Sequence, residues 1–377
     1  MMSFAQFGND LYTGRRQFDF VGRRRTWYAI SIVLLVLAAL GLFGRGLNLS
    51  LEFKGGSELR VQGVTQMDNY EQRARDTVRK VTGSDDPISV TKLGTNQIRI
   101  QAKNLGDNSA ATTDKVSQAL ATEFGVPTAS VDSSYIGPSW GKTVTNKALV
   151  ALVVFLVLVS VVLALYFRTW AMAFAALVAL LHDLAFTVGI YALTGFEVSP
   201  ATMIGFLTIL GYSIYDTVVV FDKVRENAAE AFATGRRTYG QAANYAVNQT
   251  LVRSINTSVV ALLPILSLLV VGFTLLGPGT LLDLALVLFV GIAVGTYSSI
   301  FIATPLLVSL RNREPAVQEL ARRAKQYQEL TASDETDTAQ SSSGVVDPDR
   351  EKILAEARAE RAANKRELHP WATKDAE

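Results

Sequence analysis

The aspartate Asp216 lies inside a long apolar stretch, VSPATMIGFLTILGYSIYDTVVVF, which covers residues 198–221. An ionised carboxylate at membrane depth costs at least ~2.5–3.5 kcal/mol, so it needs a partner or a function. Helical rise places Asp216 about 10 Å inside the edge marked by Lys223, and Arg253 has a similar depth in the next stretch. The sequence predicts a salt bridge or a switchable proton site formed by Asp216 and Arg253. The alternative is that Asp216 snorkels to the interface while Arg253 is an ordinary cytoplasmic anchor.

A second pair of ionisable residues, His182 and Asp183, interrupts the apolar stretch 170–193 near its middle. Adjacent residues of a helix point about 100° apart, so we do not expect the two to act as one site facing one way. They indicate either a proton relay or contact with a neighbouring helix, or a buried hydrogen-bonded pair that fixes helix packing. Tyr212 lies one turn before Asp216 on the same helical face, and Tyr215 directly precedes Asp216; both are secondary candidates for a relay or for helix packing.

Gly291 and Gly295 are spaced four residues apart in the last apolar stretch, VGIAVGTYSSIF. Small residues at this spacing let two helices approach closely. The pattern predicts a helix-packing seam, either within the bundle or with a partner chain.

The apolar residues, 49% of 377, are concentrated in blocks that can each cross a membrane as a helix. There is no cysteine, and the only histidines are His182 and His369, so a disulfide framework or a zinc-type site is not expected. A net charge of +2 does not indicate nucleic-acid binding. The sequence predicts an α-helical polytopic membrane protein that is not an enzyme, uses no cofactor or metal, and has spans at 27–43, 148–167, 170–193, 198–221, 254–276 and 281–308.

Basic residues determine the expected orientation. Lys and Arg cluster before the first span, after the second, after the fourth and after the sixth, whereas the turns after the third and fifth have none. The positive-inside rule therefore places residues 1–26, the helical loop 222–252 and the tail 309–377 in the cytoplasm. A cleaved signal peptide in place of the first span is the alternative, and it would leave five spans with conflicting loop charges.

The hydrophilic region 44–146 between the first two spans is long enough for one small extracytoplasmic domain. Its pattern predicts a strand at 57–61, a helix at 67–81, strands at 88–93 and 97–103, a helix at 111–124 and a strand at 128–136. The order β-α-β-β-α-β is typical of an α+β ferredoxin-like fold.

The tail is polar throughout. Its low-complexity patch Thr331–Asp349 is predicted to be disordered, between two charged helical segments at 315–330 and 349–367.

Five segments resemble motifs of the SecD/SecF family of protein-export membrane proteins, in the same order and over roughly residues 20–310. They are LEFKGG (51–56), ALLHDLAFTVGIY (179–191), GYSIYDTVVVFDKVREN (211–227), NQTLVRSINTS (248–258) and VGTYSSIFIATPLL (294–307). The family usually has Asn where Tyr215 stands and Asp where Glu52 stands. The resemblance implies that Glu52, Gly55 and Gly56 open the extracytoplasmic domain.

The resemblance further implies half of a resistance–nodulation–division bundle in a bacterial-type cell membrane. A homologous SecD-like chain would complete twelve spans, and the pair would associate with the SecYEG channel. Protons would drive translocation of a preprotein on the outer side, with Asp216 and Arg253 as the coupling residues. Two other functions stay open: a half-size exporter of small molecules or lipids, and a non-transporting scaffold of the translocase.

Overall fold

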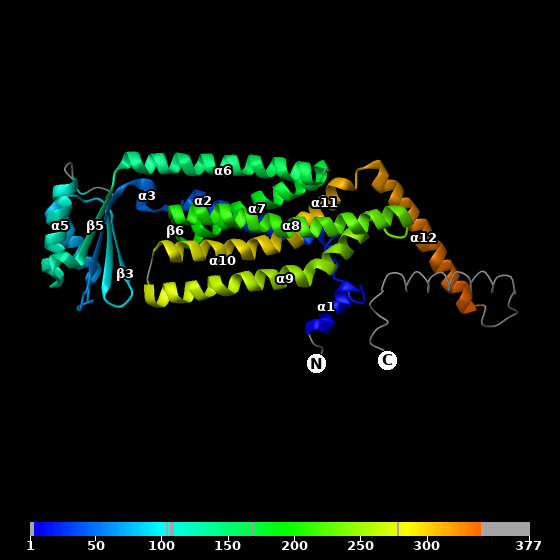
Figure 1. Ribbon diagram of the computed structural model, residues 1–377, viewed down its shortest axis with the longest axis horizontal. Coiled ribbons are helices and arrows are strands. Elements are labelled where there is room, and N and C mark those ends of the chain that lie inside the picture. The colour runs from blue at the N-terminus through cyan, green and yellow to red at the C-terminus, as the bar shows by residue number, and fades with distance from the viewer. Residues whose placement is uncertain (1–3, 103–104, 106–108, 168, 277–278, 341–377) are drawn as a thin grey trace.

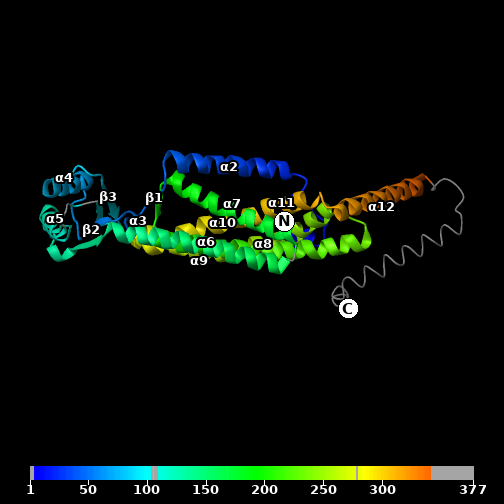
Figure 2. The same ribbon diagram turned by 90° about the horizontal axis from the view of Figure 1, so that it is seen from above.

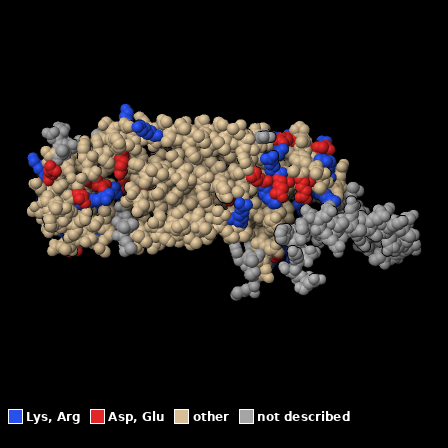
Figure 3. Space-filling view, in the orientation of Figure 1, with Lys and Arg blue, Asp and Glu red and all other residues tan. Residues whose placement is uncertain are grey.

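A long bundle of helices carries a small α+β domain at one end (Figures 1 and 2). The computed structural model describes residues 4–340, apart from 103–104, 106–108, 168 and 277–278. Six helices in this part of the chain are long and apolar enough to cross a membrane, as expected for a multi-pass membrane protein. On the face in Figure 3, charged side chains gather around the α+β domain and at the opposite end of the bundle, with a nearly uncharged band between them.

Each predicted span corresponds to one of these helices, most of which extend beyond the predicted limits. The bounds are α2 Arg24–Gly44, α6 Pro138–Phe167, α7 Trp170–Thr194, α8 Pro200–Thr234, α9 Tyr239–Val271 with the π-helical η2 Gly272–Leu276, and α10 Thr280–Ser298, which continues through the π-helical η3 Ser299–Ala303 into α11 Thr304–Arg311. The segment 222–252 is indeed helical, because the ends of α8 and α9 form it.

Polar capping residues determine where the two longest helices begin. Ser199 and Thr202 form a reciprocal capping box at the start of α8, with Pro200 in the first helical position. Thr238 and Gln241 do the same for α9. Gly235 ends α8 at φ 66°, a left-handed conformation that favours glycine. Residues within the turn itself therefore determine where α8 ends and where α9 begins.

The α+β domain, called here the head, comprises β2 to β5. Its elements are β2 Gly56–Gln62, α4 Tyr70–Thr82, β3 Ile88–Leu93, β4 Gln97–Ala102, α5 Ser109–Phe124, the single 3₁₀ turn η1 Thr128–Ser130 and β5 Val131–Ile136. The sheet has the order β3-β4-β2-β5, and every neighbouring pair is antiparallel.

The two faces of the head sheet differ in polarity. Leu59, Val61, Ile98 and Ile100 are buried in the core between the sheet and the helices α4 and α5. The residues between them, Glu58, Arg60 and Arg99, point to the opposite face, which lies toward the helical bundle (Figure 1). The strand periodicity therefore puts a polar surface against the rest of the molecule.

Short elements fasten the head to the bundle; α1 Phe4–Tyr12 lies near the opposite end (Figure 1). Strand β1, Asn48–Leu49, pairs in parallel with β6, Glu197–Val198, in the connection between α7 and α8. The one-turn helix α3, Leu51–Lys54, then leads into β2. Both ends of the head are thus held by the bundle, one by β1 and the other by α6.

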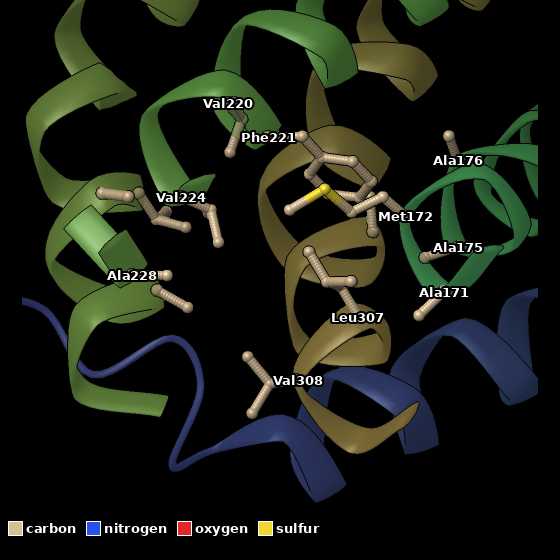
Figure 4. Close-up of a cluster of buried hydrophobic side chains, with 14 of the residues drawn as sticks. Ala171, Met172, Ala175, Ala176, Val220, Phe221, Val224, Ala228, Leu307 and Val308 are labelled. Carbon is tan, nitrogen blue, oxygen red and sulfur yellow. The ribbon is translucent and has the colours of Figure 1, made fainter. Parts of the chain in front are cut away.

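Far from the head, the bundle core relies on small side chains of α7 (Figure 4). Ala171 and Ala175, one turn apart, are fully buried, as are Phe221 of α8 and Leu307 of α11. Alanine occupies little space, so these large side chains and their helices can approach α7 closely.

The tail differs from the sequence expectation. Helix α12 runs from Pro315 to Gln340, so the prediction of disorder is wrong for residues 331–340. Val317 and Leu320 are buried, and their packing can start the helix. Once a helix has started, its extension through residues of lower helix propensity costs little free energy. The predicted helix 349–367 and the rest of the low-complexity patch lie outside the described residues.

Candidate functional site

Asp216 is buried where α8 meets α9 and the π-helical segment η3. Ser254 Oγ of α9 donates to Asp216 Oδ1 at 2.7 Å, and Ser299 Oγ of η3 donates to Asp216 Oδ2. Among the described residues no lysine or arginine forms an ion pair with this carboxylate. Two hydroxyl donors therefore stabilise the ionised form, and uptake of a proton would remove a buried charge.

Arg253 is exposed and does not form the predicted salt bridge with Asp216 in the described structure. It lines a cleft of about 620 Å³ between α8 and α9, together with Asp222 and Glu226. The predicted match in depth is nevertheless present, because Ser254, the residue after Arg253, contacts Asp216. Consecutive helical residues point about 100° apart, and the serine occupies the inward position.

Asp183 is the most deeply buried carboxylate of the bundle core. Its Oδ2 accepts hydrogen bonds from Ser213 Oγ of α8 at 2.5 Å and from Ser298 Oγ of α10 at 2.7 Å. His182 Nδ1 lies 3.2 Å from Asp183 Oδ1. The imidazole folds back toward the carboxylate, so the two residues form a buried hydrogen-bonded pair, which is one of the alternatives predicted from the sequence. Asp183 also contacts two neighbouring helices, so it joins α7, α8 and α10.

The serines at both aspartates were not singled out by the sequence as hydrogen-bond donors. Serine is common in membrane helices, and no spacing distinguishes a donor from an ordinary small residue. In the structure Ser213 lies one turn before Asp216 on α8, while Ser298 and Ser299 are consecutive. The two carboxylate sites are therefore neighbours.

Of the secondary candidates, Tyr215 points outward with 55% of its surface exposed. Tyr212 is half-buried, and its buried hydroxyl has no hydrogen-bond partner in the described part of the chain. The hydrogen bonds described for Asp216 involve neither tyrosine.

Gly291 and Gly295 lie where α10 packs on α8. A Cβ atom at Gly295 would lie 3.1 Å from Ser213 Cβ, and one at Gly291 would collide with the side chain of Ile209. Because α10 approaches α8 this closely, Ser298 and Ser299 reach the two aspartates.

The double glycine forms the turn from α3 into β2. Gly55 has φ 75° and Gly56 has φ 139°, both in the region that side chains disfavour. Glu52 Oε2, just before this turn, is buried without a hydrogen-bond partner among the described residues. A Cβ at Gly141 would lie 2.5 Å from Phe53 O, so α3 is packed tightly against the start of α6.

A charged network that the sequence pattern did not predict joins the head to the bundle. Arg99 of β4 bonds Glu58 of β2, with Nε 2.8 Å from Oε2, and Glu197 of β6, with Nη1 3.0 Å from Oε2. Gln101 Nε2 donates to Glu58 Oε2 at 3.1 Å. Because Glu197 belongs to the α7–α8 connection, this network and the β1–β6 pair both attach the head region to that connection.

The charges of the network stabilise one another. Burial opposes ionisation of Glu58, but the Arg99 charge and the hydrogen bonds of Arg60, Arg99 and Gln101 outweigh it and hold its pKa below the ordinary value. Burial likewise opposes the charge of Arg99, yet Glu197 and Glu58 raise its pKa. Both groups stay charged near neutral pH, so the junction is an ion-pair network under those conditions.

Comparisons with known proteins agree on one family. Residues 116–313 match the family described as "Protein export membrane protein SecD/SecF, C-terminal", and residues 40–66 match the "SecD/SecF GG Motif". The protein translocase subunit SecF of Streptomyces coelicolor is 42% identical over 364 residues, which cover 95% of this chain and 94% of that protein. The SecF subunit of Mycobacterium leprae is 46% identical over 83% of this chain and 68% of its own length. A crystal structure of SecDF, a translocon-associated membrane protein from Thermus thermophilus, superposes with a TM-score of 0.67 at 34% identity, over 79% of this chain and 39% of that chain.

Proposed function

The chain belongs to the SecD/SecF family of protein-export membrane proteins, and on that premise we propose that it is the accessory subunit of a Sec translocase that couples proton flow to preprotein translocation. The accessory role in the translocase follows from family membership. The coupling to protons is the proposal, and Asp216 is the observation that supports it.

A carboxylate in the position of Asp216 can act as a two-state element. Ionised, it draws the hydroxyls of Ser254 and Ser299 together and fixes α8 against α9 and η3. Protonated, it loses the charge that favours these contacts, and the helices can repack. One charge that crosses ~100 mV supplies about 2.3 kcal/mol, which is enough to bias such an equilibrium.

Arg253 has a place in this cycle on the outer surface of α9. In the structure it faces the cleft that holds Asp222 and Glu226. Rotation of α9 by one residue, about 100°, would exchange Ser254 for Arg253 at Asp216. We propose that the arginine approaches the carboxylate after the helices have repacked and the proton has left, and that it then offsets the buried charge.

The head is proposed to lie outside the cell and to have a ferredoxin-like fold. The distribution of basic residues supports this orientation, with both termini in the cytoplasm. The β-α-β-β-α-β order of elements and the strand order β3-β4-β2-β5 support the fold. In this position the head would meet the preprotein, and the network at Arg99 would transmit movement of the bundle to it.

The proposed partners are a SecD-like chain and the SecYEG channel. In the most apolar 18-residue segment of α6 only 6% of the residues are buried, and in those of α2 and α9 17% are buried. These helices therefore retain large surfaces that lipid or another chain can cover. The chain spans 39% of the Thermus SecDF chain, which leaves room there for a second half.

The substitution Asp216→Asn tests proton coupling, because it keeps the shape but cannot ionise. We expect normal membrane insertion and normal co-purification with the SecD-like chain, with loss of the stimulation of preprotein export by an imposed proton gradient. Glu230→Gln is a matched control, since Glu230 is an exposed carboxylate further along α8. It should export normally.

The same measurement separates the rival functions. A scaffold would tolerate Asp216→Asn with full export, which would refute the proposal. A half-size exporter would show no preprotein export defect even when the whole chain is deleted, but it would lose gradient-driven efflux of small molecules or lipids.

A further inference from the structure

Two buried carboxylates, Asp183 on α7 and Asp216 on α8, are contacted by consecutive residues of one helical turn. Ser298 ends α10 and donates to Asp183, while Ser299 begins η3 and donates to Asp216. The sites are also close along α8, because Ser213 contacts Asp183 one turn before Asp216. π-helical segments such as η3 are often found at functional sites. A shift of this turn necessarily affects both carboxylates.

Each of these two hydroxyls has a second acceptor on its own helix. Ser298 Oγ lies 2.7 Å from Asp183 Oδ2 and 3.2 Å from Gly295 O. Ser299 Oγ contacts Asp216 and lies 3.2 Å from Thr296 O. A hydroxyl has one hydrogen and donates to one acceptor well at a time. Its orientation therefore depends on whether the carboxylate in front of it is ionised.

We propose that Asp183 is a second proton-binding carboxylate and that Ser298 and Ser299 couple it to Asp216. On proton uptake an O–H bond forms at Asp183 Oδ2 and donates to Ser298 Oγ, and the serine hydrogen turns to Gly295 O. The same exchange occurs at Asp216 through Ser299. No other group is consumed, and the proton leaves by the reverse step.

The coupling has a defined sign. Two like charges in a buried site oppose each other, so the proton on one aspartate favours the ionised form of the other. The pair would then exchange one proton more readily than it would bind or release two. The inference rests on the proposed function, in which Asp216 binds a proton.

Few ionisable groups surround the pair in the part of the chain that the structure describes. Asp183 contacts His182 from its own helix, and only hydroxyls from α8 and α10. Asp216 contacts hydroxyls from α9 and η3, and Arg253 beside it points into the outer cleft. The carboxylates and the imidazole are therefore the groups that can hold a proton here.

His182 can follow the protonation state of Asp183. Its Nε2 is buried without a hydrogen-bond partner in the described structure, while Nδ1 faces the carboxylate. With the hydrogen on Nδ1 the imidazole donates to ionised Asp183. A proton on Oδ1 in place of Oδ2 would donate to Nδ1 of a ring that carries its hydrogen on Nε2, so His182 offers Asp183 a second position for the same proton.

Infrared difference spectroscopy during a pH titration tests the proposal, because protonated carboxylic acids absorb apart from carboxylates. The full chain is reconstituted in lipid vesicles with its SecD-like partner. We expect Asp183→Asn to remove one titrating carboxylic band and Asp216→Asn to remove another. Asp216→Asn should also move the titration midpoint of the Asp183 band to lower pH, by at least ~0.5 unit or about threefold in proton concentration.

The serine variants test the coupling. Ser298→Ala, which removes one donor from ionised Asp183, should move the Asp183 band to higher pH and, through the coupling, the Asp216 band to lower pH, and Ser298→Thr should restore both. Ser258→Ala is the matched control, because the Ser258 hydroxyl contacts Thr296 between α9 and α10 and touches neither aspartate. It should leave both bands unchanged.

Two results would overturn the inference: carboxylic bands in Asp183→Asn that equal those of the wild type, or no change of any band in Ser298→Ala. If Asp183→Asn fails to fold, the Ser298→Ala titration decides alone. A titrating Asp216 with a silent Asp183 refutes this inference and leaves the proposed function intact. A silent Asp216 in the wild type refutes the proposed function itself.

Discussion

At the residue scale, Asp216 is held by hydroxyl groups and not by a cation. Serine donors stabilise a carboxylate without keeping it permanently ionised, because a hydroxyl can also accept a hydrogen bond when the carboxylate becomes an acid. An arginine in permanent contact would keep Asp216 ionised and would prevent proton binding. The outward position of Arg253 is therefore compatible with the proposed cycle, in which Asp216 is protonated in one state and paired with Arg253 in another.

Arg253→Lys tests whether Arg253 pairs with Asp216 in one state. Lysine keeps the positive charge that anchors the helix end, but it lacks the planar fork that binds a carboxylate with two hydrogen bonds. We expect normal insertion and a fall of about tenfold in gradient-stimulated export, equivalent to ~1.4 kcal/mol. Export of a reporter under an imposed proton gradient measures it.

An Arg253→Lys variant that exports normally would limit the residue to a topological anchor. Lys223→Arg serves as the comparison, because Lys223 lines the same cleft and pairs with Glu226 on the surface at 2.8 Å.

At the element scale, close packing of α8 on α10 brings the serines to the aspartates. Small residues in α10 remove the side chains that would keep the helices apart, and this proximity determines the geometry of both carboxylate sites. A change of a single methyl group at this seam should therefore affect a hydrogen-bond network two turns away.

Gly291→Ala tests the seam against Gly211→Ala. The added methyl at Gly291 meets the Ile209 side chain, whereas a Cβ at Gly211 finds nothing within 4 Å. We expect Gly291→Ala to reduce the free energy of unfolding by about 1–3 kcal/mol through overpacking. Gly211→Ala should be neutral or slightly stabilising, since alanine is the better helix former. Thermal unfolding in detergent provides the measurement, and equal melting temperatures for both variants would contradict the packing argument.

We expect the stability of the junction between head and bundle to depend on pH through Glu58. Its pKa is lowered in the folded protein, so its contribution to stability is complete above the ordinary value of 4.5 and is lost as the pH falls through the lowered pKa. Hydrogen exchange at Ser50, whose amide donates to Val198 O, should report the loosening. We expect its protection to fall as the pH drops through the lowered pKa of Glu58.

Glu58→Gln should remove this pH dependence, and Arg99→Gln should lower the protection at every pH. Glu123→Gln is the control, because Glu123 pairs with Arg73 on the head away from the junction. Unchanged pH dependence in Glu58→Gln would exclude Glu58 as its source.

At the scale of the whole molecule, an even number of crossings would bring both termini to one side and leave the head on the other. Cysteine substitution tests this directly, since the chain has no native cysteine. Thr95→Cys, in the exposed β3–β4 turn, should react from outside with a reagent that cannot cross the membrane, whereas Thr234→Cys at the end of α8 should not. Labelling of both positions from outside would refute the orientation.

Local patterns predicted the elements well and their contacts less well. Strand β3 begins and ends at the predicted residues, because alternation and a Gly-Thr-Asn turn are local signals. The sequence showed that Asp216 and Arg253 have equal depth, but not which residue of the next helix faces the aspartate. A helix rotation of 100° decides that, and it depends on packing across the whole bundle. The sequence also did not predict the Arg99–Glu197 ion pair, because one partner belongs to the head and the other to the bundle.

The pairing of β1 with β6 has a consequence for the order of biosynthesis. Asn48 Nδ2 donates to Gly195 O although 147 positions separate them. Domains made first fold first during synthesis, so the head exists before the ribosome has made the α7–α8 connection that will hold it. Meanwhile its bundle-facing surface is open to solvent, and an apolar surface would aggregate there. The ionised face formed by Glu58 and Arg99 tolerates water during that interval, and we infer that its polarity also serves the unfinished chain.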